Sequence, residues 1–438
     1  MRVTFITLGC KVNQYETQAL KALFEEEGYQ LVSEEESADV CIINSCSVTN
    51  IADRKSRQAI RKFRRMNPAG IVAVTGCYAQ VGTEDLQAMP EVDVIAGTNE
   101  KTSLPELIRQ YAVEKTQQTR VDEYRDLGRY DEMGIVEAME GRTRAFIKIQ
   151  EGCNRFCSYC IIPYARGPVR SRREEDILEE AKSLIGSGYR EIVLTGINTA
   201  LFGSEEDGTP KLDRLIGKLS ELPGNFRIRL SSLEPTVINA DYVKRLLPYD
   251  KLCHHVHLSI QSGSDKVLKD MNRRYDREEY LEIVRTLKEF DPDYGISTDI
   301  IVGFPGETEE DFQQTLSLVR EVRFDSAFMF KYSERPGTYA ARHLPDNVPE
   351  EEKIRRLNEL IHLQTEISAQ RNREDEGKEF EVLVEGFSKR SREQLCGRTE
   401  QNKMVVFPKA GHHIGERVIV RITGSTSATL FGEAVTTC

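Results

Sequence analysis

The chain has 438 residues, of which 39% are hydrophobic and 30% charged, a balance typical of a globular protein with more than one hydrophobic core. It contains no apolar run close to the roughly 18 residues of a membrane-spanning helix, which excludes an integral membrane protein of that kind. The net charge of −11 argues against a uniformly basic nucleic-acid-binding protein, but the charge is unevenly spread, since residues 54–65 hold seven basic residues and no acid.

The N-terminus begins with a short apolar run at residues 3–8, which polar residues follow at once. This pattern predicts a first strand and not a signal peptide. Without an export signal we expect the protein in the cytoplasm, where its ten cysteines are kept reduced. Reduced cysteines can bind metals or take part in catalysis, although some of them can equally be small buried apolar residues.

The first part of the chain alternates short β-branched runs with helical stretches. Strands are predicted at residues 3–9, 40–44, 71–76 and 92–97. Helices are predicted at residues 14–27 and 53–66, with a short one near Glu84. This alternation is typical of a parallel sheet in an α/β domain, which we place at residues 1–135. The polar segment 114–140 lacks a clear period and is predicted as a linker.

A second alternation begins at Arg142 and supports a central domain at residues 139–370. Its predicted strands are residues 145–150, 191–196, 226–231, 255–260, 296–303 and 326–333. Helical stretches such as 174–187 and 277–290 separate them. Six strand–helix units predict a partial (β/α)6 barrel, in which the chemistry gathers at the carboxyl ends of the strands.

The pattern changes after a charged helix predicted at residues 350–374. From Lys378 onward, short strands follow one another without helices, separated by Gly and polar turns. They are predicted at residues 380–387, 396–399, 403–407, 417–424 and 429–435. A small β-barrel is therefore expected at residues 376–438.

Cys153, Cys157 and Cys160 form a CxxxCxxC pattern directly after the first strand of the predicted barrel. Three thiolates on a short loop can bind three irons of a [4Fe–4S] cluster and leave the fourth iron open for a ligand. Zinc would need a fourth ligand, and no other cysteine or histidine lies nearby in the sequence. The pattern therefore predicts a cluster with one open iron.

Three N-terminal cysteines each follow a predicted strand of the first sheet. Cys10, Cys46 and Cys77 come after the strands at residues 3–9, 40–44 and 71–76. The carboxyl ends of parallel strands meet at one edge of a sheet, so these cysteines can converge and hold a second cluster. Position alone leaves chance as an alternative. Cys41 lies inside a strand and is predicted to be buried packing.

These motifs resemble those of a known family over essentially the whole chain. The central motif resembles the radical S-adenosylmethionine superfamily. The methylthiotransferases have an N-terminal domain similar to TLGCKVNQYE, INSCSVT and VTGCYAQ. The last segment resembles the RNA-binding TRAM barrel. The resemblance implies two [4Fe–4S] clusters and S-adenosylmethionine, which serves as methyl donor at the auxiliary N-terminal cluster and as radical source at the central one.

The resemblance also implies residues that contact S-adenosylmethionine at the ends of the barrel strands. Tyr159 matches the family position beside the adenine, although it can equally be loop packing. The other candidates are Thr195, Gly196, Asn198, Ser232, Glu234 and Gln261. Each of them could alone be a turn residue, but polar groups at several strand ends are what a shared pocket needs.

The activity that the resemblance implies is the addition of a methylthio group to carbon 2 of an adenosine in tRNA. The opening GCKVNQYET most resembles the branch that acts on N6-threonylcarbamoyladenosine at tRNA position 37. The same chemistry on isopentenyladenosine in tRNA, or on an aspartate of a ribosomal protein, is the alternative. A non-enzymatic Fe–S or zinc protein that binds RNA is an alternative of another class. We further expect a sulfur source, an electron donor of the flavodoxin or ferredoxin type, and a monomer.

Contact with tRNA requires basic surface, which three segments could supply. A helix face with three- and four-residue spacing carries Arg54, Arg57, Arg61 and Arg65, and could also be merely solvated. The segment after the central cysteine loop carries Arg166, Arg170, Arg172 and Arg173. The C-terminal barrel carries Lys389, Arg390, Arg392, Arg398 and Lys403.

Overall fold

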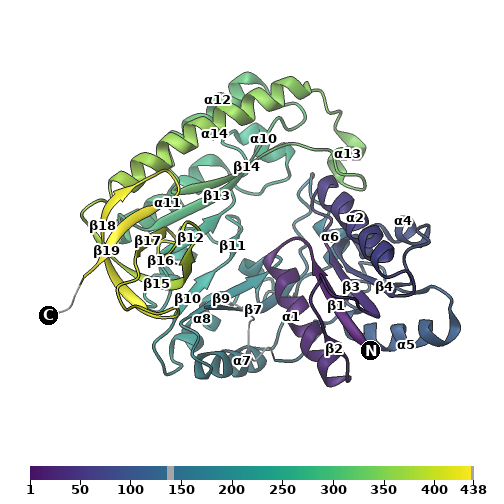
Figure 1. Cartoon of the computed structure of the whole chain (residues 1–438). Coiled ribbons are helices and arrows are strands. Elements are labelled where there is room, and N and C mark those ends of the chain that lie inside the picture. The colour runs from purple at the N-terminus through teal and green to yellow at the C-terminus, as the bar shows by residue number, and fades with distance from the viewer. Residues whose placement is uncertain (136–142, 436–438) are drawn as a thin grey trace.

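The computed structural model describes residues 1–135 and 143–435 and shows three successive parts along the chain (Figure 1). An N-terminal sheet with helices precedes a partial barrel of strands and helices, and a closed β-barrel ends the chain. This architecture confirms the predicted α/β fold class. The predicted domain boundary at residue 139 and the last three residues of the predicted C-terminal domain lie outside the described residues.

The N-terminal sheet has six parallel strands in the order β2-β1-β3-β4-β5-β6. The strands are β1 (Arg2–Thr7), β2 (Gln30–Leu31), β3 (Val40–Ser45), β4 (Ile71–Gly76), β5 (Val94–Ala96) and β6 (Gln118–Arg120). The helices are α1 (Lys11–Glu26), α2 (Asn50–Met66), α3 (Cys77–Val81), α4 (Thr83–Gln87), a 3-10 turn (Lys101–Ser103) and α5 (Leu104–Glu114). Helix α5 was not predicted. The edge strand β6 lies in the segment predicted as a linker, because three residues carry too short a pattern to recognise.

Hydrophobic cores cover both faces of this sheet. In β3, Val40 and Ile42 belong to one core, while Cys41 and Ile43 belong to the other. A parallel strand buried on both faces has a continuous apolar sequence, as β3 does. The prediction that Cys41 is buried packing is confirmed, since the residue is 0% exposed.

The central part consists of two four-stranded half-sheets. The first, in the order β10-β9-β7-β8, contains β7 (Arg144–Glu151), β8 (Arg170–Ser171), β9 (Glu191–Gly196) and β10 (Arg227–Leu230). The second, in the order β11-β12-β13-β14, contains β11 (Ser232–Leu233), β12 (His255–Leu258), β13 (Gly295–Val302) and β14 (Ser326–Lys331). An isolated parallel bridge joins the two half-sheets. It connects Ile228 of β10 with Leu252, which precedes β12.

Helices surround the half-sheets and shield one large hydrophobic core. They are α6 (Ile162–Arg166), α7 (Glu174–Gly186), α8 (Leu212–Ser220), α9 (Ala240–Leu246), α10 (Asp265–Asp270), α11 (Arg277–Phe290), α12 (Glu309–Val322), α13 (Tyr339–His343) and α14 (Glu350–Arg373), with a 3-10 turn at Thr199–Leu201. Capping boxes begin α11 and α12, where Asp276 and Thr308 bond to the first-turn backbone. No helix in residues 1–135 and 143–435 is long and apolar enough to cross a membrane.

The C-terminal barrel is closed, with strands in the order β15-β16-β17-β19-β18. Its strands are β15 (Glu379–Ser388), β16 (Ser391–Arg398), β17 (Met404–Pro408), β18 (Arg417–Ser425) and β19 (Leu430–Ala434). It packs on the amino ends of the central strands, where Arg227 donates to the Arg398 carbonyl at 2.9 Å. The N-terminal part lies on the other side of the central barrel, with α1 beside β7 and β9 (Figure 1).

Candidate functional site

The three N-terminal cysteines follow three adjacent strands of one sheet. Cys10 precedes α1 after β1, Cys46 follows β3, and Cys77 begins α3 after β4. Burial raises the pKa of the Cys46 thiol to about 11, and the nearby Cys77 and Cys10 sulfurs add to that rise. Because β1, β3 and β4 are neighbouring parallel strands, the three cysteines lie at the same edge of the sheet. Cys46 and Cys77 are buried, whereas Cys10 is exposed.

A glycine lets two of these cysteines approach each other closely. Gly9 has a φ of +102°, and a Cβ atom on it would lie 2.7 Å from the Cys46 Cβ and 2.9 Å from the Cys46 Sγ. Only glycine avoids this clash and tolerates that backbone conformation. Asn13 ties the same loops together, since its Nδ2 donates to the Leu8 and Ser45 carbonyls at 2.7 and 2.9 Å.

The central cysteines lie on the loop between β7 and α6. Arg273 donates to the Cys157 Sγ at 3.2 Å, and the Asn198 Nδ2 lies 3.9 Å from the Cys153 Sγ. Burial raises the pKa of the Cys160 thiol, and the neighbouring sulfurs of Cys157 and Cys153 raise it further. The three cysteines thus lie together on one short loop after β7, as the sequence predicts.

Each set supplies three cysteines, which is the number that a four-iron cluster with one open iron requires. No group of three or more His, Cys, Asp or Glu side chains in the described ranges is arranged around one metal ion. A four-iron cluster instead takes each cysteine on a different iron, so its ligands need not surround one point. Beside Cys153, the buried Asn198 Oδ1 has no hydrogen-bond partner among residues 1–135 and 143–435. A buried unpaired oxygen next to the cysteine loop fits a site that is completed by a bound group.

Several of the predicted S-adenosylmethionine contacts gather around the central cysteines. Glu234 pairs with Arg155 of the cysteine loop, at 3.0 Å between Oε2 and Nε. Tyr159 lies edge-on to Phe304 with 6.4 Å between ring centroids. Gln261 has a φ of +69°, and its backbone bonds to β13. Their contact with a cofactor stays a prediction.

The remaining predicted contacts lie at the ends of β9 and β11. Thr195 is buried within β9, and Gly196 ends that strand. A Cβ on Gly196 would lie 2.8 Å from the Gln150 carbonyl oxygen, so this position requires close backbone approach. Ser232 is exposed on β11. These positions are compatible with a shared pocket and do not by themselves define one.

Three arginines that we predicted to bind RNA are buried instead. Arg166, Arg170 and Arg172 are 0%, 3% and 2% exposed. Arg170 donates to the Leu127 carbonyl at 3.0 Å, and Arg172 pairs with Glu180 and Glu132. The prediction is wrong for these three, because packing of the N-terminal part and the 114–135 segment against the barrel covers them. Arg173 is exposed and pairs with Asp176 at 2.7 Å.

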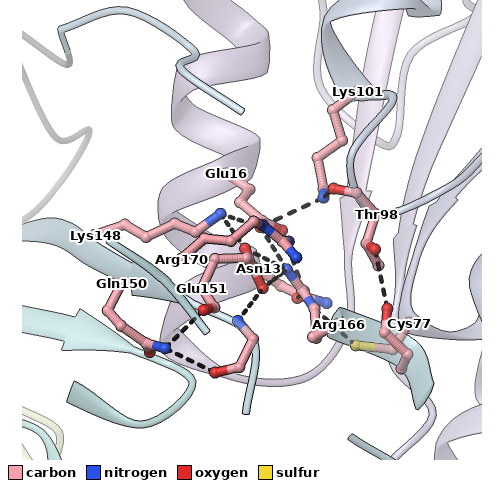
Figure 2. Close-up of polar contacts among 12 residues, drawn as sticks. Asn13, Glu16, Cys77, Thr98, Lys101, Lys148, Gln150, Glu151, Arg166 and Arg170 are labelled. Carbon is pink, nitrogen blue, oxygen red and sulfur yellow. Dashed lines mark hydrogen bonds and ion pairs between the residues drawn. The ribbon is translucent and has the colours of Figure 1, made fainter. Parts of the chain in front are cut away.

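Arg166 lies at the centre of a buried polar group beside Cys77, where the N-terminal part meets the central barrel (Figure 2). It donates to the Cys77 Sγ at 3.2 Å and to the Asn13 Oδ1 at 2.6 Å. It also pairs with Glu16 at 2.6 Å and with Glu151 at 3.2 Å. Lys148 and Lys101 reach the same Glu16 oxygen at 2.8 and 3.4 Å. Although burial opposes ionisation, these cations hold the pKa of Glu16 well below its usual range.

A second contact that the sequence did not reveal joins the segment after Cys46 to the barrel. Arg335, beyond β14, pairs with Asp53 at 2.5 Å and donates to the Ser47 Oγ at 2.5 Å. A cavity of about 950 Å³ adjoins this contact, and its wall includes Tyr78 and Ile161, which follow Cys77 and Cys160. Segments from both cysteine sets therefore share one opening.

The other predicted RNA contacts differ in exposure. Arg54, Arg61 and Arg65 are exposed on α2, while Arg57 is held against Tyr78 by a 2.8 Å hydrogen bond. Lys389, Arg390 and Arg392 are exposed around the β15–β16 turn. Arg398 lies 3.3 Å from Glu385. Lys403 is buried and pairs with Asp325 and Asp375, which disfavours an RNA contact at that residue.

Three segments of the chain match known families. Residues 147–319 match the radical SAM superfamily, residues 2–97 match Uncharacterized protein family UPF0004, and residues 373–435 match the TRAM domain. Similar solved structures include the radical S-adenosylmethionine methyltransferase TsrM from Kitasatospora setae, with cobalamin and a [4Fe–4S] cluster bound. It has a TM-score of 0.58 and 16% identity, and covers 78% of this chain and 77% of that chain. At this identity the likeness is one of fold alone.

Several proteins that are similar over nearly the whole chain share one name. A tRNA-2-methylthio-N(6)-dimethylallyladenosine synthase from Porphyromonas gingivalis is 43% identical, covering 98% of this chain and 94% of that protein. A protein of the same name from Parabacteroides distasonis is 42% identical, covering 98% of this chain and 94% of that protein. Another from Phocaeicola vulgatus is 43% identical, covering 98% of this chain and 95% of that protein.

The predicted substrate branch is therefore wrong. We expected an enzyme for threonylcarbamoyladenosine, whereas these relatives carry the name of the dimethylallyladenosine enzyme, which was our alternative. The substrate prediction rested on the motif GCKVNQYET, and the position of this motif explains the error. GCKVNQYET surrounds Cys10 and includes Asn13 and Glu16, which bond to Arg166. The motif thus reflects how a cysteine is held and not which group the substrate carries on N6.

Proposed function

Because the chain belongs to the radical S-adenosylmethionine methylthiotransferase family, we propose that it adds a methylthio group to carbon 2 of N6-dimethylallyladenosine in tRNA. The name shared by relatives that match nearly the full chain carries the choice of substrate. Two separate cysteine trios support the chemistry, because radical formation and sulfur delivery are different tasks. The domain limits 1–135, 139–370 and 376–438 remain part of this proposal.

Each trio would hold one [4Fe–4S] cluster. Cys153, Cys157 and Cys160 would bind the central cluster, and Cys10, Cys46 and Cys77 the auxiliary one. When bound, the central cluster with S-adenosylmethionine supplies the one-electron chemistry that removes hydrogen from an unactivated carbon, and the auxiliary cluster supplies the methylated sulfur.

The residues around the trios hold and orient these sites. Arg273 donates to the Cys157 Sγ and Arg166 to the Cys77 Sγ, both at 3.2 Å. A cationic donor suits a sulfur that carries negative charge as a metal ligand, so each arginine would orient its cysteine toward a cluster. Asn198, Glu234, Tyr159, Thr195, Gly196, Ser232 and Gln261 remain the proposed cofactor contacts.

The same chemistry requires partners. We propose that tRNA contacts the exposed arginines of α2 and the Lys389–Arg390 turn. An electron donor of the flavodoxin or ferredoxin type would reduce the central cluster, and a separate source would replace the consumed sulfur. A single chain carries both trios, so we propose that it acts as a monomer.

Nucleoside mass spectrometry of tRNA from a deletion strain tests the substrate. We expect 2-methylthio-N6-dimethylallyladenosine to disappear and N6-dimethylallyladenosine to accumulate. Wild-type protein should restore the methylthio nucleoside, whereas Cys157→Ala and Cys46→Ala should not. Cys396→Ala, which changes a cysteine of the C-terminal barrel, serves as the control that restores it. An unchanged level of the methylthio nucleoside after deletion would refute the proposal.

The two trios can be separated in the purified, reconstituted enzyme. Cys157→Ala should abolish formation of 5′-deoxyadenosine under reducing, anaerobic conditions, because the central cluster loses a ligand. Cys46→Ala should keep some 5′-deoxyadenosine formation but stop methylthiolation, and should lose about half of the wild-type iron. Full iron content in Cys46→Ala would contradict its role as a ligand.

A further inference from the structure

The second half-sheet presents a group of side chains that the proposed function does not yet use. Strands β12, β13 and β14 pair in parallel, with His257 opposite Ser297, and Asp299 opposite Phe328. Paired residues of neighbouring strands lie on the same face. The opposite face, with Leu258 and Ile300, packs into the large hydrophobic core. The face that carries His257 and Asp299 holds the side chains that we call the inner-face group: His257, Ser259, Asp299, Phe328 and Phe330.

The polar half of the inner-face group centres on Asp299. Its Oδ2 accepts hydrogen bonds from the Ser259 Oγ at 2.7 Å and pairs with the His257 Nε2 at 3.0 Å. Burial raises the pKa of this carboxyl, but the bonds from His257 and Ser259 outweigh it and lower the pKa below its usual value. Both bonds use Oδ2, so the fixed, ionised carboxylate can accept a further bond through Oδ1.

The apolar half consists of two phenylalanines that are open to solvent. Phe328 and Phe330 are 60% and 48% exposed. They lie two residues apart on β14 and therefore point to the same side. The Phe328 ring lies 5.8 Å from the His257 ring, which places the aromatic pair beside Asp299. Exposed aromatic rings next to a few fixed polar groups are typical of a ligand site.

The inner-face group is joined to the central cysteine loop by one side chain. Arg273 donates both to the Cys157 Sγ at 3.2 Å and to the Ser259 carbonyl at 3.0 Å. The N-terminal part approaches the same barrel through α1, which begins directly after Cys10 and packs beside β7 and β9. A molecule seated on this face would therefore lie beside the central cysteine loop, in the barrel on which the N-terminal part packs.

We propose that the inner-face group binds the modified base itself: Phe328 and Phe330 receive the branched five-carbon dimethylallyl group, and Asp299 accepts the hydrogen bond of the N6–H. His257 and Ser259 are positioning residues that fix the carboxylate. Each half of the inner-face group matches one part of the substrate. The dimethylallyl substituent is purely apolar, as are the two phenylalanine rings. The N6 nitrogen beside it carries a single donor hydrogen, which the Asp299 carboxylate can accept. This inference rests on the proposed function and specifies which residues select its substrate.

Binding of two tRNAs that differ only in the dimethylallyl group tests the inference. The holoenzyme, with both clusters reconstituted, should bind the dimethylallylated tRNA at least about tenfold more tightly than the same tRNA with plain adenosine. Phe328→Ala together with Phe330→Ala should remove most of this preference and leave affinity for the plain tRNA unchanged. Asp299→Asn should weaken binding of both tRNAs and lower kcat/KM for methylthiolation. Phe290→Ala, at a 47% exposed phenylalanine that ends α11, is the matched control.

The outcomes separate this inference from the proposed function. If the wild type makes the methylthio product and the double phenylalanine variant keeps the full preference, the inner-face group does not bind the substituent and only the inference fails. If the wild type neither prefers nor modifies the dimethylallylated tRNA, both fail. Unchanged iron content and unchanged affinity for plain tRNA in the double variant would show that its lost preference is not a folding defect.

Discussion

Arg166 links the central barrel to the N-terminal cysteine site through a single side chain. It ends α6, the short helix that follows Cys160, and its guanidinium reaches the Cys77 sulfur. In the buried polar group around it, Arg166, Lys101 and Lys148 pair with the carboxylates of Glu16 and Glu151. Arg166 also donates to the Cys77 Sγ, so it serves both the packing of the two parts and the cysteine site.

Arg166→Met should destabilise the contact between the N-terminal part and the central barrel by about 3–5 kcal/mol, because Glu16 and Glu151 stay buried with one of their two shared cations removed, and the Asn13 Oδ1 loses a donor. Hydrogen exchange in α1 and α6 measures this local stability. Arg173→Met removes an arginine that is 77% exposed, and should change stability by less than about 0.5 kcal/mol. Equal exchange rates in α1 for Arg166→Met and the wild type would contradict the structural role of Arg166.

Single residues show where reasoning from sequence succeeds and where it ends. The location of the six cysteines at strand ends and on one loop could be predicted, because each follows a strand or lies in a spaced motif, and these are local patterns. Arg166, Arg170 and Arg172 were misjudged because their burial arises from contacts with residues up to about 150 positions away, such as Glu16. A basic run looks the same in sequence whether another part of the chain covers it or not.

Helix α2 shows how one element can carry two roles. Its inner side packs Ile60 and Phe63 into the core, and Asp53 pairs with Arg335 of the central part. Its outer side exposes Arg54, Arg61 and Arg65. The three- and four-residue spacing predicted this cationic side correctly, because helical period is a property of the segment itself. The contact with Arg335 could not be predicted, since it depends on how two domains meet.

Replacing Arg54, Arg61 and Arg65 together with alanine should weaken tRNA binding and reduce its salt dependence. Each lost phosphate contact lowers the slope of log affinity against log salt by about 0.7–0.9, so three contacts lower it by about 2–3. Affinities measured over a series of salt concentrations give this slope. Alanine at Arg214, Arg245 and Arg285 makes the same charge change at exposed sites of the central part. An equal slope change in both triple variants would show that α2 makes no specific contact.

In the whole molecule, the C-terminal barrel and the cysteine sites lie at opposite ends of the central strands (Figure 1). Arg229, in the first half-sheet, donates to the carbonyls of Thr399 and Glu400 at 3.0 and 2.9 Å, while the cysteine loop follows the carboxyl end of β7. A tRNA that touches both ends must therefore extend along the barrel. The sequence predicted the three parts and their order, but not this arrangement, because the docking contacts join backbone carbonyls to distant arginines without any local pattern.

Gly295→Ala should loosen the docking of the C-terminal barrel. Gly295 begins β13, and a Cβ on it would lie 2.5 Å from the Gln401 carbonyl oxygen, so the C-terminal barrel must shift. Because the cysteine sites are at the other end, we expect normal iron content and normal 5′-deoxyadenosine formation, with faster proteolysis between the parts and several-fold weaker tRNA binding. Gly424→Ala, where a Cβ meets nothing within 4 Å, is the matched control. Unchanged tRNA affinity in a Gly295→Ala protein with accelerated proteolysis would mean that tRNA binding does not depend on where the C-terminal barrel is held.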